Sequence, residues 1–203
     1  MTIRKGELWG EPGLLADDGL QIRSDIDARR ELEEAAQLGR PPRDLGMIAG
    51  DLARTVGASD SLSRIGTPDT MRLPVDAVQV IADGVEHWFT AHLVARRPLW
   101  QGNFVVAMNA EYLGPWRMAP ASHPNDGRVD LITGRLSLGD RIKARSRLVS
   151  GTHLPHPHIT VRRVKTVELD LAGALEVCLD GEAVGRPKTL ALTVHPDALT
   201  VVV

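Results

Sequence analysis

The chain has 203 residues, of which 43% are hydrophobic and 25% charged, and its formal net charge is -2. These values are those of a globular protein with one substantial domain, and the near-neutral charge gives no reason to expect nucleic acid as a partner. The single cysteine, Cys178, excludes an intrachain disulfide and a multi-cysteine zinc site. No stretch approaches the roughly 20 apolar residues of a membrane-spanning helix, and the start lacks a signal peptide's apolar core, so we expect a cytoplasmic protein without a transmembrane segment.

The first part of the chain alternates helical patterns with turn-rich segments. Ser24 or Asp25 can cap a helix that runs to about Gln37, because apolar residues recur in it at helical spacing and a glycine and two prolines follow. A second, short helix is predicted from about Ala49 to Val56. We therefore expect residues 1–60 to form a short helical segment.

From Arg72 onward the apolar residues recur with period two. Alternating runs on both sides of Asp83-Gly84 predict a β-hairpin over residues 72–95, with Trp88 on a buried or cleft face. Further strand-like runs, each bounded by Gly, Pro, Asn or Asp, are Phe104–Asn109, Val129–Leu136, His158–Val164, Thr166–Leu171, Leu175–Leu179, Thr189–Val194 and Leu199–Val203. Only Gly139–Val149 has a helical pattern in this part. Many short strands separated by turns predict a mainly β fold, a two-sheet β-sandwich over residues 61–203.

Two acidic motifs stand between predicted strands. His123-Pro124-Asn125-Asp126-Gly127-Arg128 brings a carboxylate and backbone carbonyls together, and such hard oxygen ligands can hold Mg²⁺. Leu179-Asp180-Gly181-Glu182 offers Asp180 or Glu182 as a general base toward a substrate hydroxyl. Both motifs are also ordinary turn sequences, and Asp83-Gly84 contains the same dipeptide as a plain turn. Taken one at a time, they are explained better by turn chemistry.

The segment Gly151–His158 contains three histidines, His153, His156 and His158. Imidazoles this close together are compatible with a zinc site. Two prolines stiffen the segment, however, and no cysteine or other fourth ligand is near it in the sequence. We therefore predict a structural loop with one buried histidine and no zinc.

The order of the motifs is more specific than any one of them. Five elements follow one another: Asn109–Gly114, Asn125–Asp130, Gly151–Pro157, Leu179–Glu182 and Pro196–Leu199. Upstream of them stands Leu45-Gly46-Met47-Ile48-Ala49-Gly50-Asp51-Leu52-Ala53-Arg54. The series resembles the C-terminal half of the diacylglycerol-kinase and sphingosine-kinase superfamily of lipid kinases, over about residues 45–203.

This resemblance implies roles for several residues. Asp126 would be the carboxylate of a Mg²⁺ site that the backbone carbonyls of His123 and Arg128 complete. Asp180 would be the base for the lipid hydroxyl, with Glu182 as its neighbour or substitute. A lipid would be the substrate or ligand, which implies peripheral contact with a membrane.

The upstream part departs from the family pattern. Members carry an N-terminal α/β domain whose Gly-Gly-Asp-Gly-Thr loop holds nucleotide phosphates, and about 45 residues are too few for that domain. Ala16–Leu20 could be a remnant of this loop, without the paired glycines and the threonine. Gly50 and Asp51 are the residues that could still bind a cofactor, but Met47–Gly50 replaces the polar Thr-Gly-Asn portion of the family segment. Because a phosphate cradle needs glycines, we expect ordinary ATP binding to be lost.

Two functions follow from these expectations. The first is a lipid-binding or regulatory module with a degenerate ATP site. The alternative is an active lipid kinase, phosphorylating a diacylglycerol-like hydroxyl, whose nucleotide site is completed by oligomerisation or a partner chain. If the resemblance holds, Asp126 and Asp180 share one edge of the sandwich, where the missing domain would dock. Without that domain, apolar side chains at this edge would be exposed. We therefore expect a second copy of the chain to cover them and a homodimer to form.

Overall fold

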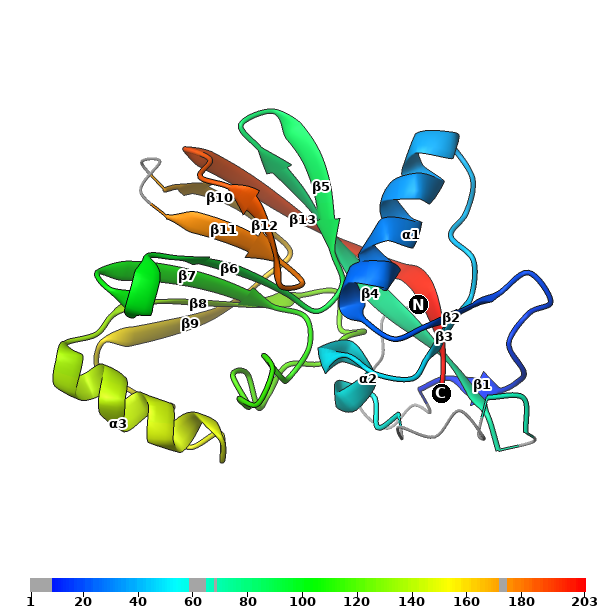
Figure 1. The fold of residues 1–203 in the computed structure, drawn as a ribbon, viewed down its shortest axis with the longest axis horizontal. Coiled ribbons are helices and arrows are strands. Elements are labelled where there is room, and N and C mark those ends of the chain that lie inside the picture. The colour runs from blue at the N-terminus through cyan, green and yellow to red at the C-terminus, as the bar shows by residue number, and fades with distance from the viewer. Residues whose placement is uncertain (1–8, 59–64, 68, 172–174) are drawn as a thin grey trace.

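Two β-sheets pack face to face, with helices at both ends of the sandwich (Figure 1). The structure is a computed structural model and describes residues 9–58, 65–67, 69–171 and 175–203. The mainly β, two-sheet fold predicted from the sequence is confirmed. In the described part of the chain, no helix is long and apolar enough to cross a membrane.

The first sheet is built on two long antiparallel strands, β4 (Met71–Ala82) and β13 (Thr189–Val202). Its order is β1-β4-β13-β3-β2, with β5 (Val85–Phe89) on β4 and β10 (Thr166–Asp170) on β13. The short strands are β1 (Glu11–Pro12), β2 (Leu20–Ile22) and β3 (Leu45–Met47). The second sheet has the order β12-β11-β6-β7-β8-β9. Its strands are β6 (His92–Arg96), β7 (Asn103–Met108), β8 (Val129–Arg135), β9 (Ile159–Val164), β11 (Glu176–Leu179) and β12 (Glu182–Gly185).

The strand β13 joins the sandwich to an α/β part. Its first half, up to His195, pairs with β4 inside the sandwich, and its second half, from Leu199, pairs with the start of β4 and with parallel β3. The register shifts between these halves, where Asp197 has a φ of 53°. The two strands predicted at the C-terminus are therefore one bulged strand, and the α/β part shares its sheet with the sandwich.

The helices α1 (Asp25–Leu38) and α2 (Asp51–Thr55) pack on the α/β part (Figure 1). The Ser24 hydroxyl caps α1 by accepting the backbone N–H of Asp27, and Gly39 ends the helix with a φ of 62°. Because β2 and β3 are parallel and α1 connects them, these elements form a strand–helix–strand unit. Both helices were predicted from the sequence, whereas the three short strands were not.

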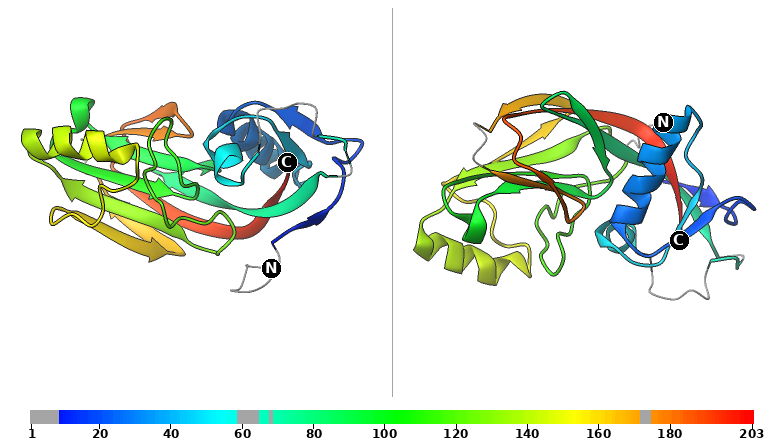
Figure 2. Two further views of the ribbon diagram at one scale, coloured as in Figure 1. Left: turned by 90° about the horizontal axis from the view of Figure 1, so that it is seen from below. Right: turned by 45° about the horizontal axis from the view of Figure 1, so that its top comes forward.

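A third helix, α3 (Leu138–Leu148), and the single turn η1 (Pro98–Trp100) lie beside each other at the far end of the sandwich (Figure 2). Leu148 and Trp100 pack on the outer side of the second sheet, against a cluster that includes Phe104 and Ile132. The main core fills the space between the sheets and is formed by fully buried residues such as Phe89, Leu93, Leu131, Leu179 and Leu190. Each of these side chains contributes about 1.5–3 kcal/mol by burial.

The hairpin predicted to turn at Asp83-Gly84 is confirmed, with the pairs Ala82–Val85 and Val78–Phe89. The strand after the turn is shorter than the sequence suggests. It ends at Phe89, and after Thr90-Ala91 the chain continues as β6 in the opposite sheet. The half-buried Trp88 ring lies 4.9 Å from the ring of His195. The crossing at Thr90-Ala91 places backbone donors between the two sheets.

Candidate functional site

A buried carboxylate binds the backbone where the chain crosses between the sheets. Asp180 lies in the turn between β11 and β12 and is only 6% exposed. Its Oδ1 accepts the backbone N–H groups of Ala91 and His92, each at 2.9 Å. Its Oδ2 accepts the backbone N–H of Thr90 at 2.8 Å and the hydroxyl of the same residue at 3.2 Å. Both oxygens of Asp180 are thus occupied by donors of the crossing segment.

Three further titratable side chains surround this carboxylate. His92 Nε2 lies 3.0 Å from Asp51 Oδ2, and the backbone N–H of Gly114 donates to the same oxygen at 2.8 Å. Asp25 accepts the backbone N–H groups of Asp51 at 2.6 Å and Leu52 at 3.1 Å. Asp25 therefore caps the N-terminus of α2, where the helix dipole favours a negative charge.

Burial competes with hydrogen bonds and neighbouring charges in setting the pKa values of this cluster. Burial, together with the charge of Asp180, raises the pKa of Asp25 to about 7. Burial also raises the pKa of Asp180, although the charge of His92 and the backbone donors oppose it. Burial opposes the charged form of His92, but the hydrogen bond to Asp51 and the nearby carboxylates outweigh it and raise the His92 pKa. For Asp51, burial is outweighed by the His92 and Gly114 hydrogen bonds, which lower its pKa. The group thus titrates as a unit and retains a proton near neutral pH.

Gly50 permits the close approach between Asp25 and α2. Its φ is 119°, and a Cβ added to it would lie 2.6 Å from Asp25 Oδ1. Gly50 and Asp51 were predicted from the sequence to bind a cofactor. In the structure the backbone N–H of Asp51 instead donates to Asp25. A phosphate at this helix start would compete with a carboxylate that is already bound there.

The loop from β2 into α1 lies at the carboxyl end of a parallel strand, a usual place for phosphate binding in α/β folds. It contains Arg23 and Ser24 and no glycine, and the Ser24 hydroxyl is used as a helix cap. Ala16–Leu20, suggested as a remnant of the family's glycine-rich loop, leads into β2 and does not join a strand to a helix. The residues at the true strand–helix junction therefore do not fit a nucleotide phosphate.

A second buried carboxylate, Asp76, holds the turn that contains Asn125 and Gly127. Asp76 accepts the backbone N–H of Gly127 at 2.6 Å and that of Asp197 at 3.1 Å. The Asn125 amide bridges Oδ1 of Asp76 at 3.4 Å and Oδ1 of Asp197 at 2.8 Å. Burial raises the pKa of Asp76 to about 6. Asp76 was missed in the sequence, where its only signal is an acidic residue within an apolar strand.

The donor set predicted to hold Mg²⁺ does not fit a cation in this arrangement. The Asp126 carboxylate forms an ion pair with Arg163 and accepts the backbone N–H of Arg128 at 3.0 Å. The guanidinium of Arg163 also lies 3.4 Å from Asp130, and with burial it lowers the pKa of His123. Because Arg163 already supplies the positive charge, a divalent ion would have to displace it. Across the residues that the structure describes, no group of three or more His, Cys, Asp or Glu could hold a metal ion.

Hydrogen bonds connect the two acidic turns through the middle of the molecule. Asn109 Nδ2 donates to the backbone carbonyls of Asp76 and Thr90, each at 2.8 Å. Thr90 donates to Asp180, and Asp76 holds the turn next to Asp126. The two turns therefore belong to one network. That Asp126 and Asp180 share one edge of the sandwich stays a prediction.

Glu182, predicted as the neighbour or substitute of the base, faces α1. It pairs with Arg29 and lies 3.6 Å from Arg30, which ties the turn before β12 to this helix. In the histidine segment, His153 is buried and the rings of His156 and His158 lie 5.7 Å apart. The predicted loop with one buried histidine is confirmed.

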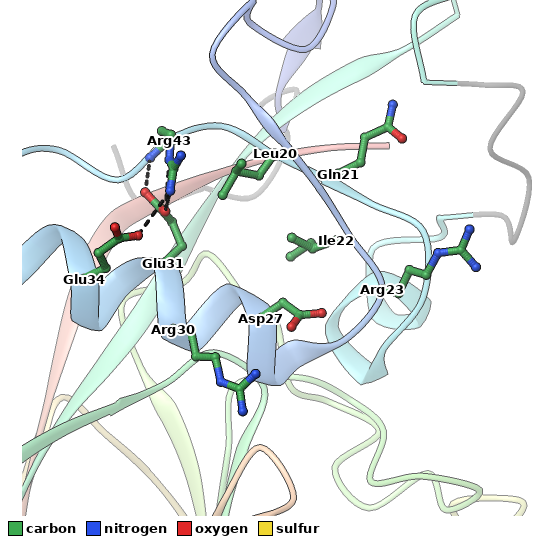
Figure 3. A pocket seen from close by; sticks show the side chains of 9 residues that line it. All are labelled: Leu20, Gln21, Ile22, Arg23, Asp27, Arg30, Glu31, Glu34 and Arg43. Atoms are coloured by element: carbon green, nitrogen blue, oxygen red, sulfur yellow. Dashed lines mark hydrogen bonds and ion pairs between the residues drawn. The ribbon is translucent and has the colours of Figure 1, made fainter.

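Three hollows of about 470, 460 and 490 Å³ open on the surface, and neither Asp126 nor Asp180 lines any of the three. The first lies between β2 and α1 (Figure 3). In it, Glu31 binds Arg43, and Arg30 points away from this pair (Figure 3). Although burial opposes ionisation, hydrogen bonds from Arg40 and Arg43 lower the Glu31 pKa to about 2. This ion network ties the loop before β3 to α1.

Most of the sequence matches the model of a known family. The sequence profile described as "YegS C-terminal NAD kinase beta sandwich-like domain" matches residues 49–203. The chain belongs to this family. The resemblance to diacylglycerol-kinase-like proteins found in the sequence is thereby confirmed.

Solved structures agree with this assignment. A crystal structure of a diacylglycerol kinase from Bacillus anthracis strain Sterne has a TM-score of 0.63 and 17% identity, over 91% of this chain and 75% of that one. Two structures from the same organism, provisionally named diacylglycerol kinases, have TM-scores of 0.67 and 0.66 and identities of 14% and 15%. Each covers 91% of this chain and 77% of its own. At such identities the likeness shows the fold alone. No curated protein sequence matches the chain.

Proposed function

We propose that this chain is a cytoplasmic lipid-binding or regulatory module of the diacylglycerol-kinase-like family, a pseudokinase that transfers no phosphate by itself. The observation that carries the proposal is the engagement of its candidate bases. Asp180 accepts four hydrogen bonds from Thr90, Ala91 and His92, and Glu182 is paired with Arg29. A general base needs a lone pair directed at the substrate hydroxyl. These carboxylates use their oxygens to hold the fold.

The nucleotide side supports the same proposal. Asp25 occupies the start of α2, where a phosphate would otherwise find backbone N–H donors. The strand–helix loop at Arg23 and Ser24 has no glycine with which to approach a phosphate. Asp126, the family's Mg²⁺ carboxylate, faces Arg163. The residues at these positions therefore do not fit ATP or Mg²⁺ on this chain alone.

A kinase assay tests the proposal. The purified chain is incubated with labelled ATP, Mg²⁺ and diacylglycerol in mixed micelles, and we expect no phosphorylated lipid above background. Asp180→Asn is the active-site variant and Asp83→Asn its matched control at an exposed turn. Turnover above background in the wild type that persists in Asp83→Asn would contradict the proposal and favour a kinase. In the same micelles the chain should still bind the lipid.

A second candidate is a lipid kinase that another chain completes. The complex of the two chains, and not this chain alone, would then bind ATP and Mg²⁺. The observation that favours it is the outer edge of β2, which pairs with no strand among the described residues. About a quarter of each similar structure also has no counterpart here. A parallel strand added at this edge would extend the sheet. Lipid phosphorylation that appears only after the missing α/β portion is added as a separate polypeptide would support this candidate.

A homodimer is the simplest way to cover that edge, and we propose it for the isolated chain. Light scattering should then give twice the chain mass of 22.0 kDa. A stable monomer across the accessible concentration range would contradict the proposed dimer, but it would not affect the geometry described for the site.

A further inference from the structure

The helix α3 carries two apolar rows on different faces, and only one of them faces the protein. Ala144 is 9% exposed and Leu148 packs on the outer side of the second sheet. Leu138, Ile142 and Val149 are instead 65%, 66% and 66% exposed. At 3.6 residues per turn these three side chains lie within about 40° of one another and about 120–160° from Ala144. The fold gives no reason for this outer apolar row.

The turn η1 extends the outer row. Leu99 is 75% exposed, and its backbone carbonyl accepts a hydrogen bond from Arg141 Nη1 at 2.8 Å. This bond fixes η1 beside the first turn of α3, as both views in Figure 2 show. Over the described residues, four of the eight large hydrophobic side chains that are exposed lie on η1 and α3. Exposed apolar residues scattered singly need no explanation, but a cluster of this kind marks an interaction surface.

The surroundings of α3 are strongly basic. Residues 135–165 contain eight lysines and arginines and one acidic residue, whereas the rest of the chain has 16 basic residues against 25 acidic ones. On α3, Arg145 lies within about 60° of the apolar row on one side and Lys143 about 100–140° from it on the other, whereas Arg147 lies on the opposite face of the helix. All three are exposed, and the Arg145 guanidinium lies 5.6 Å from the ring of Trp116. An anionic partner is thus attracted to this end of the molecule and repelled by the rest.

We propose that α3 and η1 form a docking surface for an anionic lipid bilayer. In this arrangement Leu99, Leu138, Ile142 and Val149 enter the headgroup region, while Lys143 and Arg145 contact lipid phosphates from the two sides of the row. An exposed apolar row flanked by basic side chains is the pattern of a helix that lies in a membrane interface. Nucleic acid would match the charge but gain nothing from four exposed apolar side chains. This inference goes beyond the proposed function, because docking needs neither ATP nor phosphoryl transfer.

Vesicle flotation tests the docking surface directly. The full chain is mixed, without ATP or Mg²⁺, with vesicles of phosphatidylcholine alone or of phosphatidylcholine containing phosphatidylserine. We expect binding to the phosphatidylserine vesicles only, weakened by salt. Ile142→Asp should lower this binding at least about tenfold, because a charge replaces an inserted side chain. The double variant Lys143→Glu/Arg145→Glu should lower it by about tenfold or more, since each basic residue near such a surface contributes about 1 kcal/mol.

Two matched controls lie elsewhere on the surface. Leu38→Asp changes an apolar side chain on α1 that is 65% exposed, and Arg186→Glu reverses an exposed charge beyond β12. Both should bind vesicles like the wild type, and the thermal melting of all variants should be unchanged. The proposal is overturned if the wild type binds neither vesicle, if it binds both equally, or if the α3 variants bind as tightly as the controls. RNA binding that survives Ile142→Asp, without vesicle binding, would also overturn it.

Discussion

Asp83-Gly84 and Asp180-Gly181 are the same dipeptide in the same backbone conformation, with φ values of 46° and 86° in the first turn and 48° and 90° in the second. The Asp83 carboxylate stays at the surface, where the backbone N–H groups of Lys188 and Thr189 lower its pKa. The Asp180 carboxylate is buried against Thr90–His92, and burial raises its pKa. The Asp-Gly sequence thus determines the backbone conformation of both turns. The pKa of Asp180, in contrast, depends on its burial against a segment about 90 residues away in the sequence.

We expect the largest effect on stability from a change in the buried Asp180 carboxylate, which binds the segment Thr90–His92. Asp180→Asn keeps a residue that tolerates positive φ, and its carbonyl can still accept the two N–H groups that bind Oδ1, but its amide N–H₂ replaces Oδ2 and faces the backbone N–H of Thr90. Because a buried donor left unpaired costs about 1–3 kcal/mol and the two remaining bonds lose their charge assistance, we expect a loss of about 4 kcal/mol in the free energy of unfolding. Urea denaturation measures it. A loss no greater than that of Asp83→Asn would show that the carboxylates of the two turns contribute equally to stability.

Gly50→Ala should have the next largest effect, because it pushes Asp25 away from α2. Its Cβ would lie 2.6 Å from Asp25 Oδ1, in addition to the strain of a φ of 119°. Gly57→Ala is the matched control, since Gly57 has a φ of 78° with nothing within 4 Å of an added Cβ. We expect a loss of about 3 kcal/mol for Gly50→Ala and about 1 kcal/mol for Gly57→Ala in urea denaturation. Equal losses would show that the contact with Asp25 contributes nothing.

The buried cluster should also make stability depend on pH. The folded pKa of Asp25 is about 7 against an ordinary 3.8, so its contribution is present below about pH 4 and is lost as the pH rises through 7. That difference corresponds to about 4 kcal/mol at most. The raised pKa values of His92 and Asp76 act in the same direction, whereas the lowered pKa of Asp51 changes stability only below about pH 4. We expect a fall on the order of 2 kcal/mol between pH 5 and 8.

Denaturation at a series of pH values measures this fall. Asp25→Asn should flatten it, whereas Asp17→Asn, which removes an exposed carboxylate from the turn before β2, should leave it as in the wild type. A slope that is the same in both variants would show that Asp25 does not carry the pH dependence.

The smallest expected effect belongs to the exposed turn. Asp83→Asn keeps the positive φ at this position and removes a charge that interacts with donors already accessible to water. Its urea midpoint should be hard to separate from that of the wild type. A loss comparable to that of Asp180→Asn would mean that the dipeptide itself, and not its surroundings, sets the cost.

Most of the fold was predictable because its signals are local. The cap at Ser24 and the helical spacing after it predict α1, and alternation around Asp83-Gly84 predicts the first hairpin. The strands β1, β2 and β3 have two or three residues each, too few to show a period. The change of sheet at Thr90-Ala91 is invisible in the continuous run from His87 to Val94, because the distant Asp180 binds the crossing segment.

The site was predictable in its residues more than in their roles. Asp180 and Asp51 stood out in motifs, yet Asp25, which binds the backbone of Asp51, and Asp76, which binds the turn at Gly127, were missed as site residues. Asp25 looks like an ordinary helix-start residue in the sequence, and Asp76 like a polar interruption of a strand. Their importance arises from burial and from partners at least 26 residues away, which no local pattern contains.

The central claim is that the carboxylates of this chain hold the fold and do not hold reactants. Calorimetric titration of the purified protein with ATP in the presence of Mg²⁺ tests it most directly. Because Asp25 occupies the start of α2 and Arg163 faces Asp126, we predict no saturable heat up to millimolar nucleotide. Saturable binding of about one ATP per chain to the wild type would contradict it.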